Sequence, residues 1–202
     1  IIADDIQKDG SPHLYTWRFH SAKTRSVPGT NTVRLAGTNG YLDMYFASTS
    51  SLVDGTTACP LDKSGVRDLC TTQYTICDSP FATDKTTAPV ADPYFHVALV
   101  PIKSGSGNAT PTYATMPITN GSIVSLTWTN NYTNYSILKY QNNLQTSGQG
   151  FVTDAKLSRV RVVTSSSTVY SFLLAEGTTL SYSGQELVNL YGQQGTVMKS
   201  GS

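Results

Sequence analysis

Few residues of this chain commonly act in catalysis: it has three histidines and two glutamates. Serine and cysteine hydrolases need a nucleophile beside a base, and the chain contains no Gly-x-Ser-x-Gly sequence. His20 lies on the polar face of a predicted strand and His96 lies among apolar residues, as structural histidines commonly do. His13 and His20 fall on opposite faces of a strand, which argues against a shared metal site. We therefore predict no catalytic residue and no metal-binding residue.

The carboxylates do not form a recognisable catalytic pair either. Glycosidases use two carboxyl groups about 5–10 Å apart. Glu176 and Glu186 flank a turn, and Glu186 is accounted for by a predicted helix cap. Most aspartates belong to one segment that lacks the spacing of an EF-hand, so we expect no cofactor, with calcium as the alternative. The aspartates of this segment are Asp54, Asp62, Asp68, Asp78, Asp84 and Asp92.

Two arginines offer a different kind of chemistry. Arg159 and Arg161 are two residues apart and share one face of a predicted strand. Such a pair can hold a carboxylate or a sulfated sugar. Arginines at this spacing more often face solvent or pair with a neighbouring carboxylate, so the pattern leaves both readings open.

Asparagines and aromatic residues suggest contact with carbohydrate. The chain has four acceptor sequences for N-glycosylation, at Asn120, Asn131, Asn134 and Asn108, the last followed by a proline at 111 that weakens it. Twelve tyrosines and two tryptophans supply rings that could stack on sugars. The candidates for such contacts are Trp17, Trp128, Tyr132 and Tyr135.

The three cysteines lie close together in the sequence. Cys59, Cys70 and Cys77 have spacings that match no zinc site. We expect one local disulfide. Which two of the three cysteines form it stays open, and the third cysteine keeps its thiol.

Composition limits the class of protein. Only 13% of the 202 residues are charged, against about a quarter in ordinary soluble domains. The net charge of +1 and the absence of a basic cluster argue against a nucleic-acid partner. No apolar run approaches the roughly 20 residues of a membrane span, so none is expected.

Alternating apolar and polar residues predict about ten strands. The clearest unit is a hairpin over Gly121–Tyr140, and Asn39-Gly40 and Asn120-Gly121 mark two further hairpin turns. Residues Tyr94–Ile102 are apolar at both alternating sets of positions, which predicts a strand buried on both faces.

These signals predict an all-β protein, and we expect a two-sheet antiparallel β-sandwich. A β-trefoil is the alternative, because Thr32–Tyr45, Ser122–Tyr140 and Thr168–Tyr182 look loosely alike. Ser183 and Glu186 form a capping-box pattern that predicts one short C-terminal helix over Gly184–Tyr191. Residues 1–202 are expected to form a single β domain, with a long cysteine-containing loop at about 48–92.

We expect a secreted, non-enzymatic structural protein, a subunit of a filament, a cell-wall or surface layer, or a virus shell. Its uncharged, hydroxyl-rich strands suit self-association at a cell or virion surface. A secreted lectin-like module that binds surface glycans is the alternative, and a secreted hydrolase is the third reading. No residue signature identifies a family.

Overall fold

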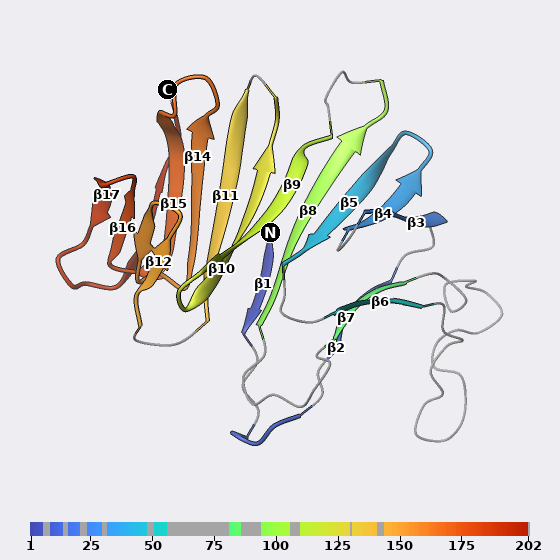
Figure 1. The fold of residues 1–202 in the computed structure, drawn as a ribbon, viewed down its shortest axis with the longest axis horizontal. Helices are drawn as coiled ribbons and strands as arrows, with labels where there is room; N and C mark the ends of the chain where they lie inside the picture. The colour runs from blue at the N-terminus through green and yellow to red at the C-terminus, as the bar shows by residue number, and fades with distance from the viewer. Residues whose placement is uncertain are drawn as a thin grey trace. The chain divides into compact units, whose positions relative to one another are not determined.

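The computed structural model describes residues 1–5, 9–13, 16–20, 24–29, 32–47, 51–55, 81–85, 94–105, 110–129, 131–140 and 144–201. The chain divides into two compact units, Ile2–Asn108 and Ala109–Ser202, the latter together with Ile1 (Figure 1). The prediction of a single domain stays a prediction.

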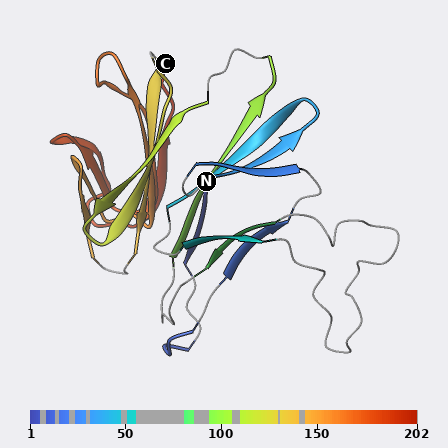
Figure 2. The same ribbon diagram turned by 45° about the vertical axis from the view of Figure 1, so that its right-hand side comes forward.

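The N-terminal unit contains two antiparallel sheets, which Figure 2 shows as two groups of blue-to-green strands. The larger sheet has the order β1-β8-β5-β4-β3 and the smaller has the order β2-β7-β6. Their strands are β1 (Ile2–Asp5), β2 (Thr16–His20), β3 (Thr24–Gly29), β4 (Thr32–Gly37), β5 (Gly40–Phe46), β6 (Ser51–Gly55), β7 (Phe81–Lys85) and β8 (Tyr94–Lys103).

The core of the larger sheet follows from the alternation of its side chains. Val33 of β4 lies opposite Met44 of β5, and both are buried with Leu35, Phe46 and Val97. The prediction of a doubly buried strand is confirmed, because successive side chains of β8 from 95 to 98 are all buried. Burying each large apolar side chain contributes about 1.5–3 kcal/mol to folding.

The C-terminal unit also contains two antiparallel sheets, drawn yellow to red in Figure 2. The larger has the order β18-β15-β14-β11-β10-β9 and the smaller has the order β12-β13-β16-β17. Their strands are β9 (Thr112–Ile118), β10 (Gly121–Thr127), β11 (Tyr132–Lys139), β12 (Thr146–Gly148), β13 (Phe151–Thr153), β14 (Leu157–Val163), β15 (Val169–Gly177), β16 (Thr179–Tyr182), β17 (Gln185–Asn189) and β18 (Gly195–Lys199).

One apolar core joins these two sheets. The larger sheet contributes residues such as Ile123, Val160 and Leu174, and the smaller sheet contributes Phe151 and Leu180. The prediction of an all-β, antiparallel sandwich is therefore confirmed. We call the face of the larger C-terminal sheet that points away from this core the outer face.

The predicted C-terminal helix is wrong. Gln185–Asn189 is strand β17, which pairs with β16. Ser183 and Gly184 form the two-residue turn between them, with φ angles of 50° and 78°, as type I′ hairpins require. The Ser-x-x-Glu pattern is a local signal, whereas strand pairing and the burial of Val188 in the core come from tertiary structure.

The predictions of hairpins and loops differ in outcome. Hairpins β4–β5, β9–β10 and β10–β11 form as expected. Thr168–Tyr182 forms no hairpin, because β15 and β16 belong to different sheets, and the trefoil alternative is therefore not seen. Within the expected loop at 48–92, β6 pairs with β7, and residues 56–80 between them lie outside the described part of the chain.

Candidate functional site

The two arginines singled out by their spacing lie on the outer face of the C-terminal sandwich. Val160 and Val162 of β14 are buried in the core, so the alternating Arg159 and Arg161 point the opposite way. Across the sheet, Arg161 lies opposite Asn134 of β11 and Ser171 of β15. The strand alternation that places both valines inside therefore places both guanidinium groups outside.

Arg161 is held in place by its neighbours on β11. Its Nε donates a hydrogen bond to Asn134 Oδ1 at 2.9 Å. Its guanidinium carbon lies 4.2 Å from the ring centroid of Tyr132, a cation–π contact. The Tyr132 ring in turn contacts Trp128, with centroids 5.3 Å apart and planes tilted by 44°. These four residues form a continuous row from the β10–β11 turn to β14.

A groove of about 260 Å³ lies beside this row. We call it the arginine groove; its lining includes Arg159, Arg161, Tyr170, Leu173, Met198 and Gly201. Tyr170 is the extra residue of a β-bulge, because Arg161 pairs with Ser171 whereas Val162 pairs with Val169. Bulges reorient side chains, and this one leaves the ring of Tyr170 exposed in the wall of the groove.

Gly201 closes one side of the arginine groove. A Cβ atom at this position would lie 2.5 Å from the ring of Tyr170, so only glycine lets the backbone approach the ring this closely. Strand β18 brings this segment to the groove by pairing with β15. Sequence reasoning missed Tyr170, Met198 and Gly201, because neither the bulge nor the β15–β18 pairing has a clear local signal.

The remaining carbohydrate candidates lie in different surroundings. Tyr135 points inward, where its ring lies 5.1 Å from Phe151 and 6.1 Å from Tyr182, so it contributes to the core. Trp17 is on β2, but its side chain is not among those described. Trp128 and Tyr132 are half-buried, and their tilted rings do not make a flat platform for a sugar.

The four glycosylation candidates differ in accessibility. Asn131 is exposed in the β10–β11 turn. Asn134 is half-buried on β11, where its amide oxygen is bound by Arg161. Asn120 occupies a turn with φ of 56° and donates from Nδ2 to the carbonyl of Gln145 at 3.2 Å. Asn108 lies outside the described residues. Of the three candidates that the structure describes, Asn131 is therefore the one best presented for modification.

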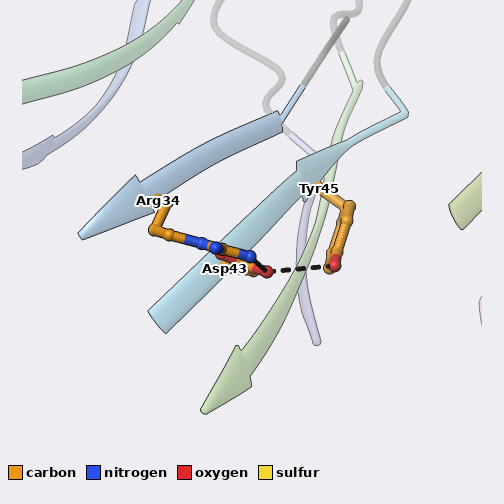
Figure 3. Close-up of polar contacts among 3 residues, drawn as sticks. All are labelled: Arg34, Asp43 and Tyr45. Atoms are coloured by element: carbon orange, nitrogen blue, oxygen red, sulfur yellow. Dashed lines mark hydrogen bonds and ion pairs between the residues drawn. The ribbon is translucent and has the colours of Figure 1, made fainter. Parts of the chain in front are cut away.

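The N-terminal unit holds an arginine in the opposite situation. Arg34 donates from Nε and Nη2 to the two carboxylate oxygens of Asp43, at 2.7 and 2.8 Å (Figure 3). The Tyr45 hydroxyl donates to the same carboxylate at 3.3 Å. Asp43 has a side chain only 1% exposed, and its hydrogen bonds with Arg34 raise the pKa of that guanidinium. Burial raises the pKa of Tyr45 above its usual range.

This network satisfies a buried charge and leaves little capacity for a ligand. The guanidinium of Arg34 also lies 3.7 Å from the ring centroid of Tyr41. A bidentate pair of this kind can compensate for burying a carboxylate, because each oxygen accepts a strong hydrogen bond. The Asn39-Gly40 signal predicts the hairpin but not this pair, because a two-residue turn at 39–40 would place residue 34 opposite residue 45. In the structure Gly37 pairs with Gly40, so residues 38 and 39 form the turn and residue 34 lies opposite residue 43.

The structure describes the surroundings of one buried histidine and of the three carboxylates in residues 109–202. His96 is 1% exposed, and burial lowers its pKa to about 4. Asp154 and Glu176 line one cavity of about 360 Å³. Although partial burial favours a higher pKa for Asp154, hydrogen bonds from Thr178 and Thr179 outweigh it and lower the pKa. Asp154 is therefore ionised and bonded within the chain, whereas a glycosidase acid requires a raised pKa. Glu186 accepts a hydrogen bond from Asn189 at 3.1 Å.

Several predicted residues lie outside the part of the chain that the structure describes. These include the three cysteines Cys59, Cys70 and Cys77, and the aspartates Asp62, Asp68, Asp78 and Asp92. Among the described residues, no group of three or more His, Cys, Asp and Glu side chains is placed to hold a metal ion.

In the described ranges, no helix is long and apolar enough to cross a membrane. No protein-family model and no curated protein matches this chain, so its function is inferred from the geometry of its own residues.

Proposed function

We propose that this protein is a non-enzymatic structural subunit that associates with copies of itself in an extracellular assembly at a cell or virion surface. The observation that carries the proposal is the uncharged edge strand β9. It ends the larger sheet of the C-terminal unit, and its seven residues, Thr-Tyr-Ala-Thr-Met-Pro-Ile, include no charged side chain.

An uncharged edge strand is well suited to pairing with another chain. Backbone N–H and C=O groups on the free side of an edge strand are available for hydrogen bonds, and natural proteins usually block such edges with charges. On β9 the exposed side chains are Thr112, Ala114, Thr115 and Pro117. Pro117, a residue that sheets tolerate at their edges, and the bridge between Thr119 and Ser147 beside the end of the strand protect one end of this edge.

The opposite edge of the same sheet offers a second surface. Strand β18 exposes Met198 at 72% and also Thr196. Pairing of β9 with β9 of a second copy would be two-fold symmetric and would give a closed dimer. Pairing of β9 with β18 of the next copy would be head-to-tail and would generate an open-ended filament.

Substitution at each edge tests the proposal and separates these two geometries. Thr115→Lys places a charge on β9, and we expect association to weaken about tenfold or more, because pairing would bury an unpaired ammonium group. Thr196→Lys should weaken association only if β18 takes part. Thr129→Lys, in the exposed β10–β11 turn, is the matched control. Native mass spectrometry and light scattering would measure the assembly.

The proposal fails if the native protein is monomeric at all concentrations, or if all three lysine variants associate as the parent does. The extracellular location has a separate test. Peptide mapping of protein from its source should find a glycan at Asn131 before any at Asn134, since Asn131 is exposed whereas Asn134 is half-buried with its amide oxygen bonded to Arg161. An unmodified Asn131 in eukaryotic source material would remove this support for secretion.

A further inference from the structure

We propose that the arginine groove binds a sulfate or carboxylate group of an acidic polysaccharide. This site is separate from the edge strand β9, and its ligand goes beyond the self-association proposed above. The groove combines three features: positive charge with no balancing carboxylate among its described lining residues, a guanidinium fixed in position, and an apolar wall.

The positive charge of the groove is not neutralised by the described residues of its lining. Arg159, Arg161 and Lys199 line it, and none of the lining residues that the structure describes is acidic. The sequence from 109 to 202 contains three carboxylates, of Asp154, Glu176 and Glu186, against five lysines and arginines. Arg159 is exposed and has no hydrogen bond or ion pair with any residue that the structure describes. A ligand anion would therefore meet a positive field with no carboxylate to displace.

Arg161 is already oriented for such a ligand. Its contacts with Tyr132 and Asn134 restrict the side chain before any ligand arrives. Both contacts are with uncharged groups, so the full positive charge remains available to an anion. Arg159 and Arg161 lie about 7 Å apart along the strand, which allows neighbouring anionic groups of one chain to engage one guanidinium each. Guanidinium groups bind carboxylates and other oxyanions through two parallel hydrogen bonds.

The apolar wall favours a sugar over a free inorganic ion. Tyr170, Leu173 and Met198 line the groove beside the arginines, and Tyr170 is 43% exposed. An aromatic side chain can pack against the C–H face of a sugar ring while charged groups hold its acidic substituent. The volume of about 260 Å³ lies just below the roughly 300–1,000 Å³ of pockets for drug-sized ligands. It suits one acidic sugar unit of a longer chain.

The charge distribution argues against a nucleic-acid ligand. Nucleic-acid binding draws its affinity from a broad basic surface that neutralises many phosphates. Residues 109–202 carry only two more cations than carboxylates, and three of the five cations line this one groove. The site is therefore local, and its expected partner is a chain with anionic groups at intervals on a neutral ring scaffold.

Calorimetric titration of the full chain with four probes tests the inference. The probes are a heparin fragment for sulfate, a hyaluronan fragment for carboxylate, neutral dextran, and a single-stranded oligonucleotide for phosphate. We expect binding to heparin, hyaluronan or both, with the stronger of the two identifying the preferred anionic group. We expect no binding to dextran and at least about tenfold weaker binding to the oligonucleotide.

Two groove variants and one matched control locate the site. Arg159→Gln should weaken glycan binding about tenfold, the loss expected for a hydrogen-bonded charge pair. Lys199→Gln should weaken it less. Lys139→Gln removes a cation of the same unit that does not line the groove, and should change the affinity less than about twofold. Thermal unfolding of each variant would show that the fold is intact.

The inference is overturned if neither acidic glycan binds, if Lys139→Gln weakens binding as much as Arg159→Gln, or if the oligonucleotide binds as tightly as the glycans. The Thr115→Lys variant separates this inference from the proposed assembly, because β9 does not line the groove. Loss of assembly with unchanged glycan binding would support both proposals. Glycan binding by a protein that never assembles would support this one alone.

Discussion

Arginines on two sheets of this molecule have opposite surroundings. In the N-terminal unit, Arg34 makes two hydrogen bonds to the buried carboxylate of Asp43. In the C-terminal unit, Arg159 and Arg161 lie on a sheet face whose neighbouring groove has no carboxylate among its described lining residues. Both sites arise from strand alternation, and both place a guanidinium next to a tyrosine ring. The two sites differ in that a carboxylate, Asp43, lies beside the guanidinium group of Arg34.

This difference separates a structural charge from one that is available to a ligand. A buried carboxylate needs its arginine, because removing one partner leaves an uncompensated charge in a poorly solvated place. The outer-face arginines stabilise nothing of comparable cost, so their positive charge is free to bind an external anion. The same residue type therefore has two roles that are set by its cross-strand neighbours.

The largest expected effect comes from removing the structural arginine. Arg34→Gln leaves Asp43 buried without its bidentate partner, and we expect the free energy of unfolding to fall by about 3–5 kcal/mol. Arg159→Gln is the matched control and should change it by less than about 0.5 kcal/mol. Urea denaturation would measure both. Equal losses in the two variants would contradict the contrast between the sites.

A double variant sharpens the same point. Adding Asp43→Asn to Arg34→Gln removes the buried charge itself, so the double variant should be more stable than Arg34→Gln alone. A double variant that is less stable than Arg34→Gln would show that the charge of Asp43 is not the cause.

The second-largest expected effect concerns His96, the buried histidine of the N-terminal unit. Its pKa is about 4 in the folded state, against 6.5 for an ordinary histidine. Between these pH values the unfolded chain binds a proton more readily than the folded chain does. The free energy of unfolding is therefore largest above about pH 6.5 and falls by about 3 kcal/mol as the pH drops toward 4. Denaturation curves at about pH 7.5, 5.5 and 4.5 would measure the slope. His96→Gln should flatten it, and an unchanged slope would assign the pH dependence to other groups.

A smaller effect is expected for the structural carboxylate of the C-terminal unit. Asp154 Oδ1 accepts hydrogen bonds from the backbone N–H groups of Thr178 and Thr179, each at 2.8 Å. Asp154→Ala should cost about 1–2 kcal/mol in unfolding free energy. Because the pKa of Asp154 is lowered, this contribution is present above about pH 3.8 and is lost as the pH falls further. Asp154→Asn keeps one acceptor oxygen and should lose less, and a larger loss for Asn would contradict this account.

The smallest effect is expected where an arginine loses an uncharged partner. Asn134→Ala removes the hydrogen bond to Arg161 Nε, and we expect a loss of about 0.5 kcal/mol, because the guanidinium can be solvated instead. Chemical denaturation of Asn134→Ala and of Arg34→Gln under the same conditions would give the ratio of the two losses in unfolding free energy. A loss as large as that of Arg34→Gln would mean that Arg161 is also a structural arginine.

The sequence by itself determined the local features of this protein. Asparagine at turn positions 39 and 120 and alternating strands specify hairpins, because turn geometry and side-chain alternation depend on neighbouring residues. The spacing of Arg159 and Arg161 likewise placed them on one face. The register of β4 and β5 was not determined by the Asn39-Gly40 signal, because residues 38 and 39 form the turn and thereby place Arg34 opposite Asp43.

Tertiary structure alone decided what depends on distant partners. Residues 185–189 match a helix signal, yet they form a strand because β16 supplies hydrogen bonds and the core buries Val188. The arginine groove exists because β18 pairs with β15 and a bulge exposes Tyr170. Strand pairing is non-local, since hydrogen bonds form between residues whose separation in the chain carries no local signal. The sequence therefore determines which residues are charged, and the order of the strands in the sheets decides which of these charges are neutralised by a neighbour.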